Sequence, residues 1–155
     1  MLEFKQPTQI MLQFIADNMR DADIDEVRAA SNKDPLTAVT EGVKVSDFTS
    51  VAVINGDIVA VMGVVKGSAL TDNGVAWLLG TTFVDKHRRE FLESSHKVLN
   101  AMLDICPELS NYVHAENKTS IRWLKWLGFQ INDPEPFGVN DELFHEFKIR
   151  KGCNV

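Results

Sequence analysis

The sequence has 155 residues, of which 45% are hydrophobic and 25% are charged. This composition is typical of a globular protein, and the length fits a single domain over residues 1–155. With 22 acidic and 16 basic residues, the formal net charge is −6, which argues against direct binding to nucleic acid or to an anionic membrane surface. The apolar runs are a few residues long, whereas a transmembrane helix needs roughly 18. We therefore expect no membrane span.

The two cysteines give no sign of a metal site. Cys106 and Cys153 form no C-x-x-C pair and have no histidine at the spacing of metal ligands. Cys106 follows an apolar helical stripe, so we expect a small buried core residue. Cys153 lies close to the C-terminal end, where we expect an exposed side chain. Both fit a reducing compartment, and no bound metal is expected.

The first third of the chain predicts helices. A short extended segment is expected over 2–5, and a helix with one apolar stripe begins after Pro7. A second helix is expected over 23–31. A third begins at Asp34 and Pro35, where an acidic cap precedes proline at the first helical position.

The middle of the chain predicts strands. Residues 49–54 and 58–66 are apolar and rich in β-branched side chains, and Asn55-Gly56 between them is typical of a hairpin turn. Another apolar strand is expected over 75–81.

The second half predicts a long amphipathic helix over 85–106, ended by Pro107. Its apolar stripe recurs at steps of three and four: Phe91, Leu92, Ser95, Val98, Leu99, Met102, Leu103 and Cys106. A strand over 109–115 and a short helix over 119–127 follow, and Gly128 ends that helix.

The last part of the chain predicts two more strands, over 129–131 and 143–149, with a loop from Pro134 to Gly138 between them. Helices and strands therefore alternate without an internal repeat, which predicts a mixed α/β fold.

This order of elements resembles that of the GNAT N-acetyltransferase superfamily. The segment from Asn117 to Phe129 resembles the late family motif N-x-x-A-x-x-x-Y-x-x-x-G-F, with Ser120 in place of the small alanine and Gly128 in register. Asparagine caps a helix at that position, and Gly-Phe ends it against the sheet. The resemblance implies a GNAT-like domain with a central, mostly antiparallel sheet of six to seven strands flanked by about four helices.

The same resemblance implies acetyl-coenzyme A as the cofactor if the protein is an enzyme. In the family, a glycine-rich loop R/Q-x-x-G-x-G/A at the start of the long helix holds the pyrophosphate on backbone N–H groups. Arg89 matches the first position and Ser94 is small, but Leu92 replaces the first glycine, and Glu90 and Glu93 add negative charge.

The resemblance assigns coenzyme A binding to five residues: Val84, Arg88, Arg89, Ser94 and Asn117. Two interpretations of the basic run Lys86-His87-Arg88-Arg89 stay open. It could compensate for the missing glycines by binding phosphate, or it could be the solvated first turn of a helix.

The acid–base groups of the family are also missing. The tyrosine that serves as general acid is replaced by Leu124, and the strand over 75–80 has no titratable side chain. His114 and Glu116, at the end of the next strand, are the nearest substitutes for catalysis, because alternate strand residues share one face. They could equally be exposed residues at a strand end.

Several segments resemble a narrower group, the internal virion protein A family of short-tailed, T-seven-like phages. They are Asn111-Tyr112-Val113, Asn117, Ser120-Ile121-Arg122, Leu124-Lys125, the tryptophan strand 76–80, the Arg-Arg-Glu-Phe start of the long helix, and the loop 134–138. This resemblance implies a virion-interior or host-cytoplasm location, with other virion proteins as partners.

The remaining aromatic and acidic side chains have more ordinary interpretations. Trp77, Trp123 and Trp126 are expected to pack in the core or at its rim, although they could line an acyl groove. The acidic clusters at 21–26 and 133–142 are interpreted as solvated faces and loops, although in an enzyme they could attract a basic amine substrate.

Two main functions therefore stay open, beside a third option, modification of DNA or of a host protein, in which the net charge argues against direct DNA binding. The first is a phage GNAT-fold protein with degenerate acetyltransferase motifs and a structural or binding role, which the missing loop, tyrosine and glutamate favour. The second is an acetyl-coenzyme A-dependent N-acyltransferase acting on an amine or protein substrate.

Overall fold

One mixed sheet forms the centre of the computed structural model, which describes residues 1–68 and 70–152. Its eight strands follow the spatial order β1-β2-β3-β4-β5-β8-β6, with β7 paired to β8. The strands are β1 (Leu2–Lys5), β2 (Phe48–Ile54), β3 (Asp57–Lys66), β4 (Asn73–Gly80), β5 (Glu108–His114), β6 (Gln130–Ile131), β7 (Glu135–Phe137) and β8 (Glu142–Arg150). Every pairing is antiparallel except β4 with β5.

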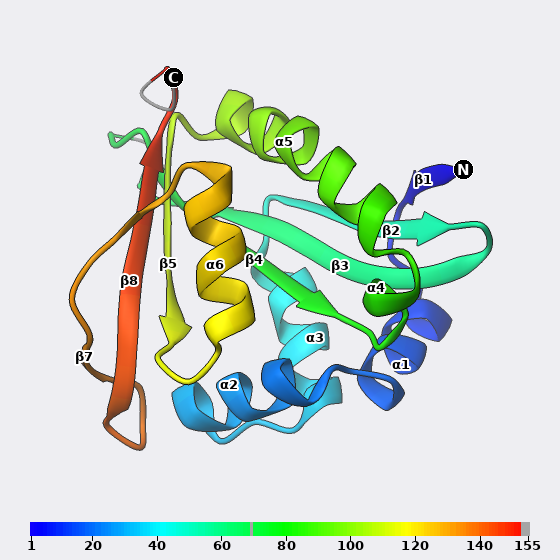
Figure 1. Ribbon diagram of the computed structural model, residues 1–155, viewed down its shortest axis with the longest axis horizontal. Coiled ribbons are helices and arrows are strands. Elements are labelled where there is room, and N and C mark those ends of the chain that lie inside the picture. The colour runs from blue at the N-terminus through cyan, green and yellow to red at the C-terminus, as the bar shows by residue number, and fades with distance from the viewer. Residues whose placement is uncertain (69, 153–155) are drawn as a thin grey trace.

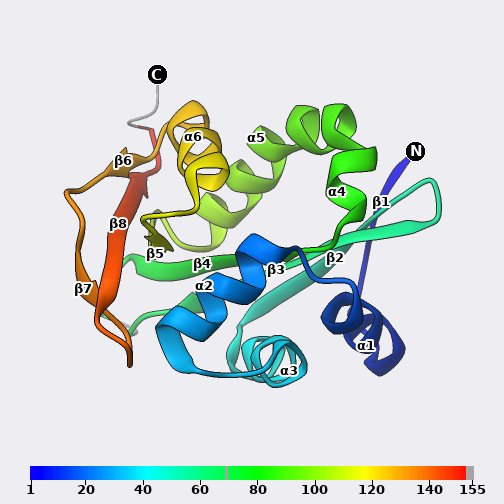
Figure 2. The ribbon, with the colours of Figure 1, turned by 60° about the horizontal axis from the view of Figure 1, so that its bottom comes forward.

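Helices cover both faces of this sheet (Figures 1 and 2). They are α1 (Gln9–Asp17), α2 (Asp21–Ser31), α3 (Pro35–Val45), α4 (Phe83–Lys86), α5 (Arg88–Ile105) and α6 (Lys118–Leu127). Two buried clusters hold the layers together. One joins α5 and α6 to one face of the sheet, and the other joins α1 and α3 to the opposite face.

The mixed α/β class predicted from the sequence is confirmed, with two differences in detail. The sheet has eight strands rather than six to seven, because β6 and β7 are short segments that pair with β8, and β7 lies inside the expected loop 134–138. The described residues form six helices rather than about four, and the predicted helix over 85–106 is two of them, because the backbone of His87 (φ −117°, ψ 32°) leaves the helical region between α4 and α5.

Several local predictions are confirmed by hydrogen bonds. Asp34 Oδ1 accepts from Thr37 N at 3.0 Å at the start of α3, and Asn117 caps α6. Gly128 ends α6 with a φ of 107°, in the left-handed region that favours glycine. Cys106 is buried, whereas Cys153 lies outside the described residues. Among the described residues, no helix is long and apolar enough to cross a membrane.

Candidate functional site

The parallel strands β4 and β5 separate toward their C-terminal ends (Figure 1). They pair only at their starts, where Asn73, Gly74 and Val75 of β4 face residues 108–110 of β5. Beyond this point the space between residues 76–80 of β4 and residues 111–114 of β5 is here called the split. A gap inside a sheet must be filled by other groups, because unpaired backbone amides are costly when buried.

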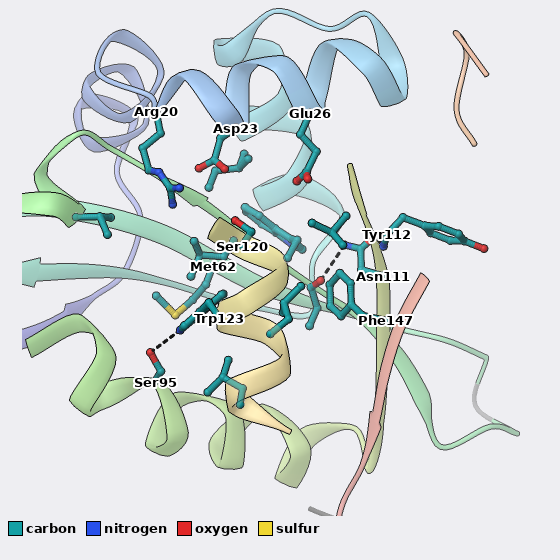
Figure 3. A pocket seen from close by; sticks show the side chains of 18 of the residues that line it. Arg20, Asp23, Glu26, Met62, Ser95, Asn111, Tyr112, Ser120, Trp123 and Phe147 are labelled. Carbon is teal, nitrogen blue, oxygen red and sulfur yellow. Dashed lines mark hydrogen bonds between the residues drawn. The ribbon is translucent and has the colours of Figure 1, made fainter. Parts of the chain in front are cut away.

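A cavity of about 910 Å³ opens at the split. Its walls come from β3, β4, β5, α2, α5 and α6, and are mostly apolar. Figure 3 shows Asp23 and Glu26 pointing into it from α2, across from Ser95 of α5 and Trp123 of α6. The volume lies in the range of ordinary ligand sites.

The inner edge of β4 directs alternate backbone groups into the split. In an antiparallel pair, only every second residue bonds to the neighbouring strand. Thr81 N donates to Val59 O at 2.9 Å, and the β3–β4 register is continuous from there. The odd-numbered residues of β4 therefore bond to β3, whereas Ala76, Leu78 and Gly80 direct their N–H and C=O groups into the split.

The inner edge of β5 follows the same rule. Ala115 N donates to Leu143 O at 2.9 Å, which fixes the odd-numbered residues as the ones that bond to β8. Tyr112 and His114 therefore direct their backbone groups toward β4.

Side chains replace part of the missing ladder. Near the narrow end, Asn111 Nδ2 donates to Ala76 O at 2.8 Å, and its Oδ1 accepts from Tyr112 N at 2.8 Å. One amide side chain thus bridges the two strands.

At the wide end, two carboxylates of α2 take the same role. Asp23 Oδ2 accepts from Gly80 N at 2.7 Å. Glu26 Oε1 accepts from His114 N at 2.8 Å and lies 3.4 Å from Asn117 Nδ2. The helix α2 therefore holds the ends of both strands.

Burial changes the acidity of both groups. Burial raises the pKa of Glu26 to about 7, and the Asp23 carboxylate adds to this, although the His114 N–H and the Asn117 amide oppose it. Burial also raises the pKa of Asp23, against the opposing effects of Arg20 and of the Gly80 N–H. A carboxyl group with a pKa of about 7, as Glu26 has, can exchange a proton near neutral pH.

These two residues correct the interpretation of 21–26 as a solvated acidic face, because Asp23 is buried. The signal was present in the sequence. Asp23, Val27 and Ala30 recur at steps of four and three, so Asp23 lies on the same helix face as apolar side chains, and Glu26 lies one turn from it.

The residues expected to act in catalysis do not come together. The backbone of His114 contacts Glu26, but its buried ring bonds through Nε2 to Glu142 Oε1 at 2.9 Å, and Glu142 in turn pairs with Arg28 at 2.9 Å. β5 ends at His114, so Glu116 lies in the following turn and is exposed. Neither side chain lines the cavity.

The residues expected to bind the cofactor divide into two groups. Val84, Arg88 and Ser94 line one wall of the cavity. Arg89 points to solvent, with 88% of its side chain exposed. Asn117 is buried as the cap of α6, where its Oδ1 accepts from Ser120 N at 3.3 Å.

The basic run 86–89 is neutralised by nearby carboxylates. Lys86 Nζ and His87 Nε2 lie 3.1 Å and 2.8 Å from Asp57 Oδ2. Arg88 pairs with Asp85 at 3.3 Å, and Arg89 pairs with Glu93 at 3.0 Å. Hydrogen bonds from His87 and Lys86 lower the pKa of Asp57, so that carboxylate stays charged at neutral pH.

Aromatic contacts connect α5 to α6 beside this segment. The rings of Phe91 and Trp123 lie 5.7 Å apart, and Trp123 Nε1 donates to Ser95 Oγ at 3.3 Å. His96 and Trp126 form a second contact, with ring centroids 4.6 Å apart. The two helices therefore pack directly on each other.

These observations test whether coenzyme A fits. The split could accept an extended chain that carries amide groups. The helix entrance does not suit a diphosphate, because a carboxylate accompanies each of its basic groups and Leu92 replaces a glycine. The residues present therefore fit only part of the cofactor. In the described part of the chain, no group of three or more His, Cys, Asp or Glu side chains could hold a metal ion.

Comparison with solved structures identifies the class as the GNAT fold. An N-acetyltransferase from Staphylococcus aureus matches with a TM-score of 0.65 at 12% identity, covering 97% of this chain and 98% of its own. A GNAT-family acetyltransferase from Bacillus anthracis matches with a TM-score of 0.68 at 11% identity, covering 96% and 94%. A spermidine N-acetyltransferase chimera from Vibrio cholerae and hSSAT has a TM-score of 0.60 at 12% identity, covering 96% and 95%.

A match to a protein family classifies the chain more narrowly than the fold does. Residues 51–134, more than half of the chain, match the family described as "Bacteriophage T7, probable scaffold protein Gp13", and the chain belongs to that family. No curated protein matches the sequence.

Proposed function

We propose that this protein is a non-enzymatic, GNAT-fold binding protein of a phage, associated with other virion proteins in the particle or in the infected cell. The main support for this proposal is that each basic residue at the junction of α4 and α5 has a carboxylate partner. These residues are Lys86, His87, Arg88 and Arg89. A diphosphate would have to displace those partners and approach the same acidic groups.

Two further observations support a binding role. The family carries the description of a probable scaffold protein, and scaffold proteins act through contacts with other proteins. The position of the family's general acid is occupied by Leu124, which is buried and has no proton to donate. A location in the virion interior remains part of this proposal, with the host cytoplasm as the alternative.

One observation favours the second candidate, an acetyl-coenzyme A-dependent N-acyltransferase acting on an amine or protein. Glu26 faces a large cavity, and burial raises its pKa to about 7. A carboxylate with that pKa could take a proton from an amine near neutral pH. A structural role also explains Glu26, because its carboxylate accepts a hydrogen bond from the His114 N–H at the split.

Isothermal titration calorimetry with acetyl-coenzyme A separates the two functions. We expect no heat of binding at micromolar ligand. Arg88→Ala and Arg89→Ala form a matched pair, because Arg88 lines the cavity and Arg89 points to solvent. Micromolar binding that Arg88→Ala abolishes and Arg89→Ala leaves unchanged would overturn the proposal in favour of the enzyme.

A further inference from the structure

The split leaves one pairing position open between the groups that fill its two ends. Asn111 occupies the narrow end, and the carboxylates of Asp23 and Glu26 occupy the wide end. Leu78 lies between them on β4, with its N–H and C=O directed into the split. Among the described residues, no other backbone or side-chain group bonds to them.

This position is accessible from the cavity. Leu78 and Tyr112 are partly exposed and both line it. Tyr112 N is taken by Asn111, but the described residues provide no partner for Tyr112 C=O across the split. The N–H and C=O groups of Leu78 on β4 and the C=O group of Tyr112 on β5 could therefore pair with an extended chain of amides inserted between the two strands.

The wide end adds a charge preference. Arg20 accompanies Asp23, whereas no lysine or arginine of the described residues forms an ion pair with Glu26. Two strand residues, roughly 6.6 Å, separate Leu78 from Gly80, whose N–H bonds to Asp23, and the same spacing separates Tyr112 from His114, whose N–H bonds to Glu26. A basic group beside the paired residue of an inserted chain would therefore reach Glu26.

We propose that the split is a receptor for an extended peptide segment of a partner protein, which pairs with Leu78 as an added strand and directs a lysine toward Glu26. The inserted residue between those contacts would place its side chain against the apolar lining of the cavity, to which Met62 of β3 and Phe147 of β8 both contribute. This inference rests on the proposed binding function, and it assigns that function to a specific place.

The test uses the isotopically labelled full chain and a pool of blocked pentapeptides, acetyl-Ser-Lys-X-Thr-Ser-amide, in which X is Val, Ile, Leu, Phe or Tyr. We expect the amide resonances of Leu78 and Tyr112 to shift, and hydrogen exchange at Leu78 to slow. If neither resonance moves at millimolar peptide, the proposal is wrong.

Matched peptides test the contacts without altering the protein. N-methylation of residue X removes one backbone donor and should weaken binding about fivefold. At pH 8, where Glu26 carries its charge, replacing the lysine by glutamate or norleucine should weaken binding about tenfold or more. Equal binding of the N-methylated peptide would refute strand pairing.

Matched protein variants test whether the negative charge of Glu26 contributes to peptide binding. Glu26→Gln keeps an oxygen for the His114 N–H but removes the negative charge, so it should weaken the lysine peptide about tenfold at pH 8 and leave the norleucine peptide unchanged. Glu116→Gln, an exposed carboxamide outside the cavity, should change neither.

Pantetheine and acetyl-coenzyme A are tested as alternative ligands in the same binding experiment. Pantetheine binding tighter than every peptide would overturn the peptide receptor, because it would assign the open position to a different amide chain. If the peptides fail and acetyl-coenzyme A also fails, the proposed non-enzymatic function stands and only this inference is lost. Acetyl-coenzyme A binding would instead contradict the proposed function itself.

Discussion

Glu26 occupies an unusual place for a carboxylate. It sits on α2 beside an apolar cavity, accepts from His114 N at 2.8 Å, and has the Asp23 carboxylate nearby. Burial disfavours the charged form more than the hydrogen bond from His114 favours it, so the pKa rises to about 7 from an ordinary value near 4.5. The fold therefore favours the protonated side chain.

This difference predicts a pH-dependent gain in stability for Glu26→Gln. The folded-state pKa of Glu26 is raised, so its contribution is fully present below about pH 4.5 and is lost as the pH rises through 7. Glutamine stays neutral and keeps an acceptor for His114. We expect the variant to match the wild type at pH 4.5 and to exceed it at pH 8 by up to about 3 kcal/mol, measured by urea unfolding.

Glu116→Gln is the control for that experiment. Its side chain is exposed in the turn after β5, so the change should stay within about 0.5 kcal/mol at both pH values. A Glu26→Gln variant that is equally destabilised at pH 4.5 and pH 8 would contradict the account of burial.

At the scale of elements, polar contacts help to hold α2 across the wide end of the split. Beyond Asp23 and Glu26, its C-terminal end receives the turn before β8. Val139 N donates to Ala30 O at 3.0 Å, and Asn140 Nδ2 donates to Arg28 O at 3.0 Å. This turn approaches α2 so closely that a Cβ on Gly138 would lie 2.6 Å from Ala30 O.

Substitutions at two glycines distinguish the cost of a steric contact from the cost of backbone strain. Gly138 and Gly56 both have a positive φ, of 79° and 84°, but only Gly138 has heavy atoms within 4 Å of an added Cβ. Gly56→Ala should cost about 1 kcal/mol through strain alone. Gly138→Ala should cost about 1–3 kcal/mol more, because the turn must move away from α2.

Chemical denaturation of the two variants measures this difference. Accelerated amide exchange in α2 should accompany Gly138→Ala and not Gly56→Ala. Equal losses in the two variants would show that contact with Ala30 does not hold the helix.

A second element-scale prediction concerns the contact between α5 and α6. Trp123 packs against Phe91 and bonds to Ser95, whereas Trp126, one turn on, is 53% exposed. Trp123→Ala should cost about 3–5 kcal/mol of unfolding free energy, and Trp126→Ala less than about 1 kcal/mol. Thermal and urea unfolding measure both. Similar losses at the two positions would contradict the difference in burial between the two side chains.

At the scale of the whole molecule, the sheet has a continuously paired half and a half that contains the split. The half from β1 to β4 is continuously paired and packed by helices on both faces. The parallel contact between β4 and β5 lasts only three residues, and the cavity lies where it stops. The fold thus places an open backbone edge inside the molecule and closes it with side chains and with α2.

Much of the local structure was predictable because the signals are short-range. Asp34, Asn117 and Gly128 act at helix ends within a few residues of their hydrogen-bond partners. The break at His87 was not predictable in this way, because a tertiary contact holds that residue: its ring bonds to Asp57, thirty residues earlier.

The candidate site was harder to predict than the fold. Val84, Arg88 and Ser94 do line the cavity, but Arg89 and Glu116 point to solvent and the ring of His114 turns toward β8. A side chain's direction at a strand end depends on where pairing stops, which the local sequence does not encode.

The sequence by itself determined the element order, the helix caps, the hairpin turn and the mixed α/β class, since periodicity and turn chemistry are local properties of the chain. Only the tertiary structure decided which charges meet. It paired each basic group of 86–89 with a carboxylate and buried Asp23 and Glu26 against strand ends more than fifty residues away. Both outcomes depend on solvent exclusion and on distances through space, which no spacing along the chain specifies.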